Sequence, residues 1–270
     1  MGWSIHHPVG LIHHTPAAAW RGYTLVVTIR GDQAVLVDME GRVCHRWRYY
    51  EGIDYAYLLL NGHLLCRTHA PSDVEMVGGL GGSASAIVEL DWDGNLVWEL
   101  ENPWMHHDFQ RLDNGNTLAL VWEEMSSEMT FRVKGGFTTA EDPVQMLGDV
   151  VREFTPSGEV VHEWKSWEHL DFDADVICPL EGRREWTHGN SINVTADGGY
   201  LVSFRQTSTV GIVDRESGRF TWKWGPGEVS HQHNPSFLDN GRVLLFDNGS
   251  HRRAPNTNYS RIVEIDPANN

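Results

Sequence analysis

Hydrophobic and polar residues alternate in the same two patterns four times along the chain. The first pattern is a strand, an acidic turn and a Trp-rich strand, and it reads VLVDMEGRVCHRW, IVELDWDGNLVWEL, VREFTPSGEVVHEW and VGIVDRESGRFTWKW. The second pattern follows as LLLNGHLL, RLDNGNTLAL, TADGGYLVS and FLDNGRVLL. Two alternating runs joined by a Gly-containing turn predict a β-hairpin, because successive side chains of a strand point to opposite faces. Each repeat therefore predicts four strands.

The repeat length identifies the fold class. The turn glycines of the first pattern recur at spacings of 53, 64 and 60 residues, and they are Gly41, Gly94, Gly158 and Gly218. Four-stranded units at such a period predict an all-β β-propeller, whose blades surround a central channel. We expect five to six four-stranded blades. The final residues, RIVEIDPANN, repeat the opening strand of a fifth repeat and then end, so we also expect the chain to lack C-terminal strands.

The repeats predict one domain over residues 1–270. Residues 1–20 precede the first clear strand and form an N-terminal extension in this interpretation. Three longer stretches between the predicted strands, residues 70–86, 123–149 and 165–186, are interpreted as inter-strand insertions. Long loops in a compact repeat fold are often lids or binding loops, so we expect these insertions to cover one mouth of the channel.

One register position collects polar residues in all four repeats. Counting back eight residues from the turn glycine of each second hairpin gives Asp54, His107, Asn190 and His233. Equivalent positions in successive blades point in equivalent directions, so these four residues are predicted to converge on one pocket. Their neighbours Tyr55, His106 and His231 join Asp54 and Asn190 as predicted substrate-binding residues. The alternative is that these polar residues only cap strand ends.

Composition and charge limit the classes of partner that the protein is expected to bind. A formal net charge of -16 disfavours nucleic acid and anionic membranes, which both require a basic surface. Homo-oligomers are possible because exposed sheet edges need covering. The sequence contains no apolar stretch of membrane-spanning length and no secretory signal pattern, so with Met1 as the start we expect a cytoplasmic protein.

Cysteine and histidine contents point to different chemistries. The three cysteines, Cys44, Cys66 and Cys178, are odd in number and lie in strand-like or apolar contexts, which favours buried free thiols over a disulfide framework. Fifteen histidines admit nucleophilic, acid-base and metal-ligating roles near neutral pH. No GxxxxGK[ST] loop is present, so a nucleotide donor bound by that motif is not expected.

Three segments together resemble the bacterial arylsulfotransferase family, whose enzymes work without a nucleotide sulfate donor. The segments are WMHHDFQRLDNGNTLAL, EWTHGNSINVTADGGYLVSFRQTSTVGIVD and SHQHNPSFLDNGRVLLFDNG, followed by YSRIVEID. The resemblance covers roughly residues 20 to 270. It implies a six-bladed propeller with its site in the central channel, and transfer of a sulfuryl group between small phenolic compounds without a cofactor. The expected partner is therefore a small anionic or aromatic substrate.

The resemblance also implies roles for individual residues. The histidine of the Q-H motif is His233, which would attack sulfur and carry the sulfuryl group transiently. The H-x-N pair corresponds to His188 and Asn190, and the arginine of SFR corresponds to Arg205. The HHD histidine corresponds to His107, with His106 as the second choice. Cationic donors suit this chemistry because charge develops on the equatorial oxygens of the sulfuryl group, and a planar guanidinium matches a multi-oxygen anion.

Two alternatives stay open at the level of the sequence. His107, His188 and His233 with a water would also resemble a catalytic zinc or iron site of a lyase, hydrolase or oxygenase. A propeller could instead be a non-catalytic binding module, although gathering histidines and an arginine at one place carries a desolvation cost. Arg205 distinguishes the first two interpretations, because it favours an anionic substrate and is an unfavourable neighbour for a dication.

Overall fold

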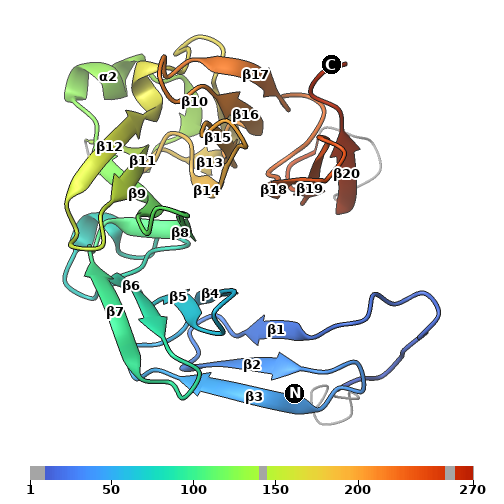
Figure 1. Cartoon of the computed structure of the whole chain (residues 1–270). Coiled ribbons are helices and arrows are strands. Elements are labelled where there is room, and N and C mark those ends of the chain that lie inside the picture. The colour runs from blue at the N-terminus through green and yellow to red at the C-terminus, as the bar shows by residue number, and fades with distance from the viewer. Residues whose placement is uncertain (1–9, 140–144, 253–258, 270) are drawn as a thin grey trace, which may run out of the picture. The chain divides into compact units, whose positions relative to one another are not determined.

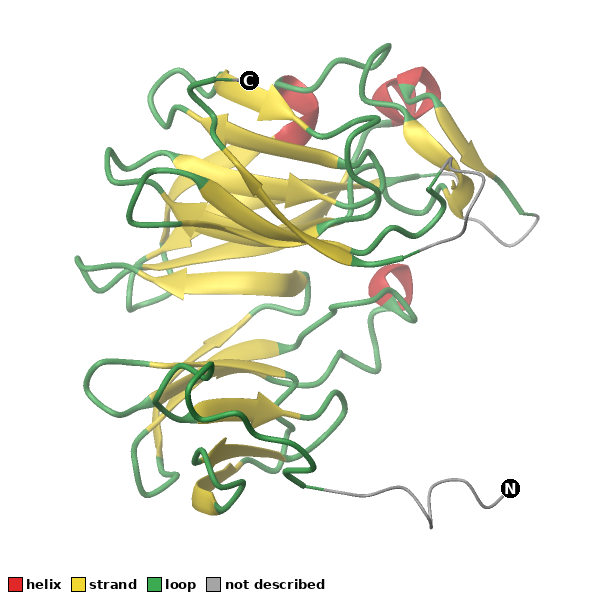
Figure 2. Ribbon diagram, turned by 90° about the vertical axis from the view of Figure 1, so that its right-hand side faces the viewer, coloured by secondary structure: helices red, strands yellow, loops and turns green. Residues whose placement is uncertain are grey.

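The computed structural model describes residues 10–139, 145–252 and 259–269. Strands dominate this part of the chain, and its helices are short (Figure 2). Contacts divide the chain into two compact units, one made of Met1–Ser72 and Ala84–Pro103 and the other of Asp73–Ser83 and Trp104–Asn270. We call them unit 1 and unit 2. Residues 1–9 of the predicted N-terminal extension lie outside the described residues.

Unit 1 contains two antiparallel sheets, labelled in Figure 1. The three-stranded sheet has the order β1 (Thr24–Val27), β2 (Gln33–Val37) and β3 (Val43–Arg48). The four-stranded sheet has the order β4 (Tyr55–Leu58), β5 (Leu64–Arg67), β6 (Ala86–Leu90) and β7 (Leu96–Glu101). Their buried faces share one core, in which Trp47, Ile53 and Leu64 are fully buried.

Unit 2 contains three further antiparallel sheets. The first has the order β12 (Val160–Lys165), β11 (Leu147–Phe154), β9 (Thr117–Glu124) and β8 (Met105–Arg111). The second has the order β14 (Gly189–Val194), β15 (Tyr200–Phe204), β16 (Thr209–Val213) and β17 (Phe220–Trp224). The third has the order β18 (His233–Phe237), β19 (Val243–Asp247) and β20 (Arg261–Ile265).

These five sheets are the blades of an all-β β-propeller, so the predicted fold class is confirmed. The described residues give blades of three or four strands rather than four throughout. The structure also shows how the repeats are divided between blades. Each four-stranded sheet joins the second hairpin of one repeat to the first hairpin of the next repeat, as β4-β5 joins β6-β7.

The predicted insertions carry secondary structure of their own. Residues 70–86 include the 3-10 turn η1 (Glu75–Val77), and residues 123–149 include α2 (Ser127–Arg132) and β10 (Gly135–Phe137). Residues 165–186 include η2 (Ser166–Glu168) and β13 (Ile177–Gly182), and β13 pairs in parallel with β10. Residues 140–144 lie outside the described residues. Within the described part of the chain, no helix has the length and apolar character needed to span a bilayer.

Tryptophans of the outer strands connect one blade to the next. In unit 1 the indole Nε1 of Trp47, on β3, donates to the carbonyl of Asp91 in the β6-β7 turn at 3.0 Å. In unit 2 Nε1 of Trp164, on β12, donates to the carbonyl of Gly218 in the β16-β17 turn at 2.9 Å. Trp47 and Trp164 both lie six residues after their turn glycines, which is why the same connection recurs.

The three cysteines are free, as the sequence predicts, but only one is buried. Cys66 lies in the core of unit 1, where burial raises the pKa of its thiol to about 12. Cys44 is exposed and Cys178 is half-buried, which corrects the expectation that all three are buried. Cys44 lies on β3, whose side chains alternate between buried and exposed, and Cys178 lies on the short strand β13 of an insertion.

The first strands of the three sheets of unit 2 are neighbours, with β14 in contact with both β8 and β18. Side chains bridge these strands to backbone groups. Asp108 on β8 accepts from the amide of Ile192 at 2.9 Å, and the amide group of Asn193 donates to the carbonyl of Pro235 on β18 at 2.9 Å. Each of the three strands also contains a register shift at its N-terminal half. These bulges change which side chains reach the space at the ends of the strands.

Candidate active site

Three histidines and an arginine of unit 2 gather at the N-terminal ends of β8, β14 and β18. His107 lies on β8, His188 directly precedes β14, His233 begins β18, and Arg205 directly follows β15. The imidazole rings of His107 and His188 are 4.5 Å apart at an angle of 70°. Burial is the largest cause that lowers the pKa of His233, and the charges of His188 and Arg205 lower it further, which places both near His233.

The backbone at this locus is strained. His107 and His188 have φ angles of 47° and 51°, and His231 and His251 have φ of 58°. Left-handed backbone is uncommon for residues other than glycine and costs about 1–3 kcal/mol each, so such residues cluster where function requires a fixed side-chain direction. Four histidines in this conformation within unit 2 make the locus a candidate functional site.

His188 is held by a carboxylate. Its Nδ1 donates to Glu185 Oε1 at 2.5 Å, and the other oxygen of Glu185 accepts from the indole of Trp122 at 3.1 Å. Burial alone would lower the pKa of His188, but the carboxylate of Glu185 raises it above the ordinary histidine value. With Nδ1 bound to Glu185, Nε2 is the nitrogen of His188 that remains for a ligand. The imidazole therefore favours the protonated form, which can donate a proton.

The surroundings of His233 have the opposite effect on its pKa to those of His188. Its Nδ1 lies 3.0 Å from the carbonyl oxygen of His231 and 2.7 Å from Oδ1 of Asn248. A carbonyl oxygen can only accept, so Nδ1 carries the proton and Nε2 holds a lone pair. Burial, followed by the cations nearby, lowers the pKa of His233 despite these two hydrogen bonds. The imidazole is therefore neutral near neutral pH, which is the form of a nucleophile.

His107 is supported from both sides. Its backbone amide donates to the carbonyl of Gly82 at 2.8 Å, and a side chain at Gly82, where φ is 81°, would overlap the imidazole. Nδ1 of His107 lies 3.0 Å from Nδ1 of His106, so one of the two rings donates to the other. The segment around Gly82 therefore fixes the position of the His107 ring.

His106 lies behind the site rather than in it. Its side chain is buried and stacks on Trp122 with the ring centroids 4.1 Å apart. Its Nε2 lies 3.2 Å from Oδ1 of the buried Asp149. Burial would raise the pKa of Asp149, but His106 and the hydrogen bonds from Thr187 and Gly189 hold it below the ordinary value. His106 thus connects His107 to a buried carboxylate.

Arg205 points toward Glu181, a residue that the sequence does not single out. The guanidinium nitrogen lies 2.8 Å from Glu181 Oε1, and about a quarter of the Arg205 side chain is exposed, at 23%. The backbone amide of Arg205 donates to the carbonyl of His188 at 3.1 Å, so the arginine is fixed relative to the start of β14. This geometry leaves the guanidinium accessible to an anionic group.

Besides His106, two further predicted substrate-binding residues of unit 2 are buried. Asn190 is 8% exposed, and its amide group donates to the carbonyl of Gln232 at 2.8 Å, which ties β14 to β18. The bulge between Gly189 and Ser191 explains why His188, and not Asn190, is the neighbour of His107. His231 is 1% exposed and lies against His251 and Glu181. Substrate contact by Asn190 and His231 stays a prediction.

Asp54 and Tyr55 belong to unit 1. Oδ1 of Asp54 accepts from the backbone amide of Arg30 at 2.5 Å and lies 3.6 Å from Nε2 of His69. The hydroxyl of Tyr55 is 3.0 Å from that of Tyr57. Their participation in the pocket also stays a prediction.

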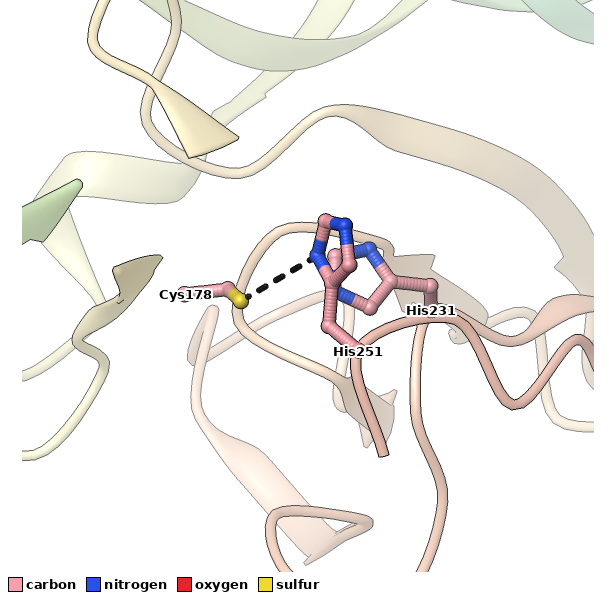
Figure 3. A group of neighbouring side chains, drawn as sticks. All are labelled: Cys178, His231 and His251. Atoms are coloured by element: carbon pink, nitrogen blue, oxygen red, sulfur yellow. Dashed lines mark hydrogen bonds between the residues drawn. The ribbon is translucent and has the colours of Figure 1, made fainter. Parts of the chain in front are cut away.

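A further cluster lies beside Arg205, and Figure 3 shows its three members, Cys178, His231 and His251. They come from β13, from the segment before β18 and from the segment after β19. Among the described residues this is the one group of three or more His, Cys, Asp or Glu whose ligand atoms all lie close together, within 4.8 Å. The group shares no residue with the metal ligands His107, His188 and His233 that the sequence suggests.

Five residues of the two clusters are not among those that the sequence predicts: Glu185, Asn248, Glu181, Cys178 and His251. A signal exists for Glu185, which stands three residues before His188 in EWTH, and for Asn248, which stands in the repeated DNG motif. Glu181 and Cys178 lie in an insertion, where repeat register carries no information.

Comparisons with known proteins agree with this fold. Residues 32–229 match the model of a family described as Arylsulfotransferase (ASST). Among curated proteins no relative matches the chain. Two similar solved structures are a protein of unknown function from Bacteroides caccae and a streptogramin B lyase. The first has 16% identity, a TM-score of 0.51 and coverage of 91% of this chain and 73% of that one. The second has 11% identity, a TM-score of 0.50 and coverage of 94% of this chain and 66% of that one. At these identities the likeness shows the fold alone.

Proposed function

Because this chain belongs to the arylsulfotransferase family, a family of transferases, we propose that it transfers a sulfuryl group between small phenolic compounds through a sulfo-histidine at His233. The observation that carries the proposal is that two nearby histidines have different hydrogen-bond partners at Nδ1. His233 donates through Nδ1 to a carbonyl and keeps a lone pair on Nε2, whereas His188 is paired with Glu185. One imidazole is thus prepared to attack and the other to give a proton.

In the first half-reaction Nε2 of His233 attacks the sulfur of an aryl sulfate. An N–S bond forms while the S–O bond to the aromatic ring breaks, and the phenolate leaves with the bonding electron pair. The protonated imidazole of His188 supplies the proton that makes the leaving group a phenol. Arg205 faces the sulfuryl oxygens, where a guanidinium stabilises the charge that develops in the transition state.

In the second half-reaction a phenolic acceptor takes the place of the first phenol. The neutral His188 removes its proton, the phenolate oxygen attacks sulfur, and the N–S bond breaks. His233 regains its lone pair and His188 its proton, so the enzyme returns to its starting state. Both half-reactions use the same residues, and two-step exchange of this kind gives ping-pong kinetics. No cofactor is needed.

His107 completes the proposed site as a donor to the sulfuryl group. Its ring lies 4.5 Å from that of His188, and its direction is fixed by the left-handed backbone and by Gly82. His106 acts as a positioning residue through its contact with His107.

A metal-dependent reaction at His107, His188 and His233 is the alternative enzymatic interpretation. The hydrogen bonds of Nδ1 to Glu185 and to Asn248 fit either interpretation, because metal-bound histidines also donate through their other ring nitrogen. Arg205 lies within electrostatic reach of His188 and His233. A guanidinium favours an anion and repels a dication there, which favours sulfuryl transfer.

The test is to trap the intermediate. The full chain is incubated with an aryl sulfate and no acceptor, then quenched in base and digested for mass spectrometry. We expect the mass of one sulfuryl group on the peptide that contains His233, and its disappearance when a phenol is added before the quench. A modified peptide elsewhere, or turnover of aryl sulfates without any modified histidine, would contradict the proposal.

A further inference from the structure

Cys178, His231 and His251 hold their ligand atoms within 4.8 Å of one another, and a fourth residue lies beside them. Nδ1 of His251 is 3.5 Å from Sγ of Cys178 (Figure 3). Oε1 of Glu181 is 3.3 Å from Nδ1 of His231 and 3.5 Å from Nδ1 of His251. The set therefore offers one thiol, two imidazoles and one carboxylate.

Three of the separations match those between ligands of one tetrahedral ion. Zinc lies about 2.3 Å from sulfur and about 2.0–2.2 Å from nitrogen or oxygen, which places tetrahedral ligand atoms roughly 3.3–3.6 Å apart. The separations of 3.3, 3.5 and 3.5 Å lie within that range. The ligand atoms of Cys178, His231 and His251 spread over up to 4.8 Å, so the widest pair must come closer when an ion binds.

Nδ1 of His231, whose side chain is 1% exposed, is buried and has no hydrogen-bond partner among the described residues. Oε1 of Glu181 lies 3.3 Å from it and is paired with the guanidinium of Arg205 at 2.8 Å. A buried polar atom without a hydrogen bond is costly, and an ion bound to Nδ1 of His231 would satisfy it.

The backbone holds the two histidines in place without a ligand. Ser230, which precedes His231, accepts from the amide of Gly249 at 2.9 Å, and its hydroxyl donates to the carbonyl of Ser250. These bonds join the segment before β18 to the segment after β19. Both histidines have left-handed backbone, at φ of 58°. The site is therefore built in advance rather than formed by mobile side chains.

We propose that Cys178, Glu181, His231 and His251 bind a zinc ion in a closed, structural site. Thiolate and imidazole ligands suit zinc, and four protein ligands leave no open position for a water. The ion would tie β13, which belongs to an insertion, to the segments that flank β18 and β19. His231 then serves as a ligand rather than as a substrate contact.

Charge balance permits this ion beside Arg205. The thiolate and the carboxylate together neutralise a dication, and a carboxylate oxygen has room for a second partner. Glu181 can therefore bind the ion and keep its contact of 2.8 Å with Arg205. A metal-bound carboxylate that also holds Arg205 would orient the guanidinium toward the candidate active site.

The inference does not depend on sulfuryl transfer, and its test does not use turnover. The full chain is purified without a histidine tag, stripped with a chelator and titrated with cobalt(II). We expect one equivalent to bind with the intense visible bands of four-coordinate cobalt and a thiolate-to-cobalt charge-transfer band. The absence of these bands from the wild-type protein would overturn the proposal, whatever the variants do.

Variants identify the ligands. Cys178→Ser should lose the charge-transfer band, and His251→Ala should weaken cobalt binding by at least about 100-fold, since loss of outer partners alone costs 10–100-fold. Glu181→Gln should weaken binding while keeping the charge-transfer band. The matched controls are Cys44→Ser, at an exposed thiol, and His13→Ala, at an exposed histidine.

Two results would contradict the ligand set. One is a charge-transfer band that survives in Cys178→Ser but disappears in Cys44→Ser. The other is cobalt binding by Glu181→Gln that equals that of the wild type. Each variant is checked by far-ultraviolet circular dichroism, and the wild-type titration decides the question if a variant does not fold. Zinc measured in the untreated protein by mass spectrometry should reach one equivalent.

Discussion

The starts of β14 and β18 each present a histidine, but the two imidazoles meet opposite surroundings. His188 is bound by the carboxylate of Glu185, which raises its pKa, whereas His233 is bound by the neutral amide of Asn248 and has a lowered pKa. Both are half-buried, and the charge of Arg205 acts on both. The partner of Nδ1 therefore separates their protonation states, which is how one site obtains an acid and a nucleophile at the same pH.

The largest effect is expected at the nucleophile. His233→Asn removes Nε2, and because no other group can form the N–S bond, kcat/KM for an aryl sulfate should fall at least about 10⁴-fold. Steady-state kinetics measure the loss, and circular dichroism checks the fold. His63→Asn, a histidine of unit 1 paired with Glu89, is the control and should keep full activity. Turnover by His233→Asn near the wild-type rate would remove His233 from its role.

The charge of Arg205 acts on both His188 and His233, so substitutions of Arg205 should change the two histidines together. Arg205→Gln removes the cation that lowers the pKa of both, so both values should rise together, and kcat should fall by about 10²–10³ because transition-state charge loses its partner. Arg205→Lys keeps the charge but not the planar fork, and it should recover only part of the rate. Kinetics of both variants measure the effect. Equal activity of Arg205→Gln and the wild type would exclude the guanidinium from the reaction.

Glu185→Gln makes the surroundings of His188 resemble those of His233. Without the carboxylate the pKa of His188 falls, so the imidazole is deprotonated over more of the pH range. The wild type should show a bell-shaped profile of kcat/KM, limited at acid pH by protonation of His233 and at alkaline pH by loss of the His188 proton. In Glu185→Gln the alkaline limb should move to lower pH, with a loss of about 10–100-fold at neutral pH. An unmoved alkaline limb would contradict the role of His188 as acid.

Asn248→Asp makes the reverse exchange and should have the smallest effect. A carboxylate at this position raises the pKa of His233, so the acid limb of the profile moves to higher pH while the alkaline limb stays. Above the new limb the rate should be within a few fold of the wild type, because the lone pair on Nε2 is restored. The same profile of kcat/KM against pH measures it. A shift of the alkaline limb instead would reverse the assignment of the two histidines.

The repeats allowed the fold and part of the site to be predicted. Turn glycines and alternation determine the hairpins locally, and His107 and His233 follow from the same register count. The bulges do not follow from it, because they depend on how neighbouring strands pack. One bulge buries Asn190 against Gln232 and leaves His188 beside His107. The family resemblance, rather than the register, supplied His188 and Arg205.

Residues outside the repeat pattern could not be found in this way. Glu181 and Cys178 lie on β13, in an insertion, and His251 follows β19. They approach His231 only through tertiary packing. A sequence pattern can reveal residues that are neighbours along the chain or that occupy equivalent positions in the repeats. The residues of this cluster are related in neither way.

The tryptophan on the outer strand affects which gains and losses of sequence such a chain can tolerate. Trp47 and Trp164 each cap a turn of the following blade, and each belongs to the same place in its repeat. The second repeat has Leu100 at this place and offers no indole there. A copied repeat that carries the tryptophan brings with it both the indole that donates to the next blade and the turn that accepts from the previous one. Gain of such a whole repeat therefore preserves these hydrogen bonds, whereas a cut inside a repeat separates them.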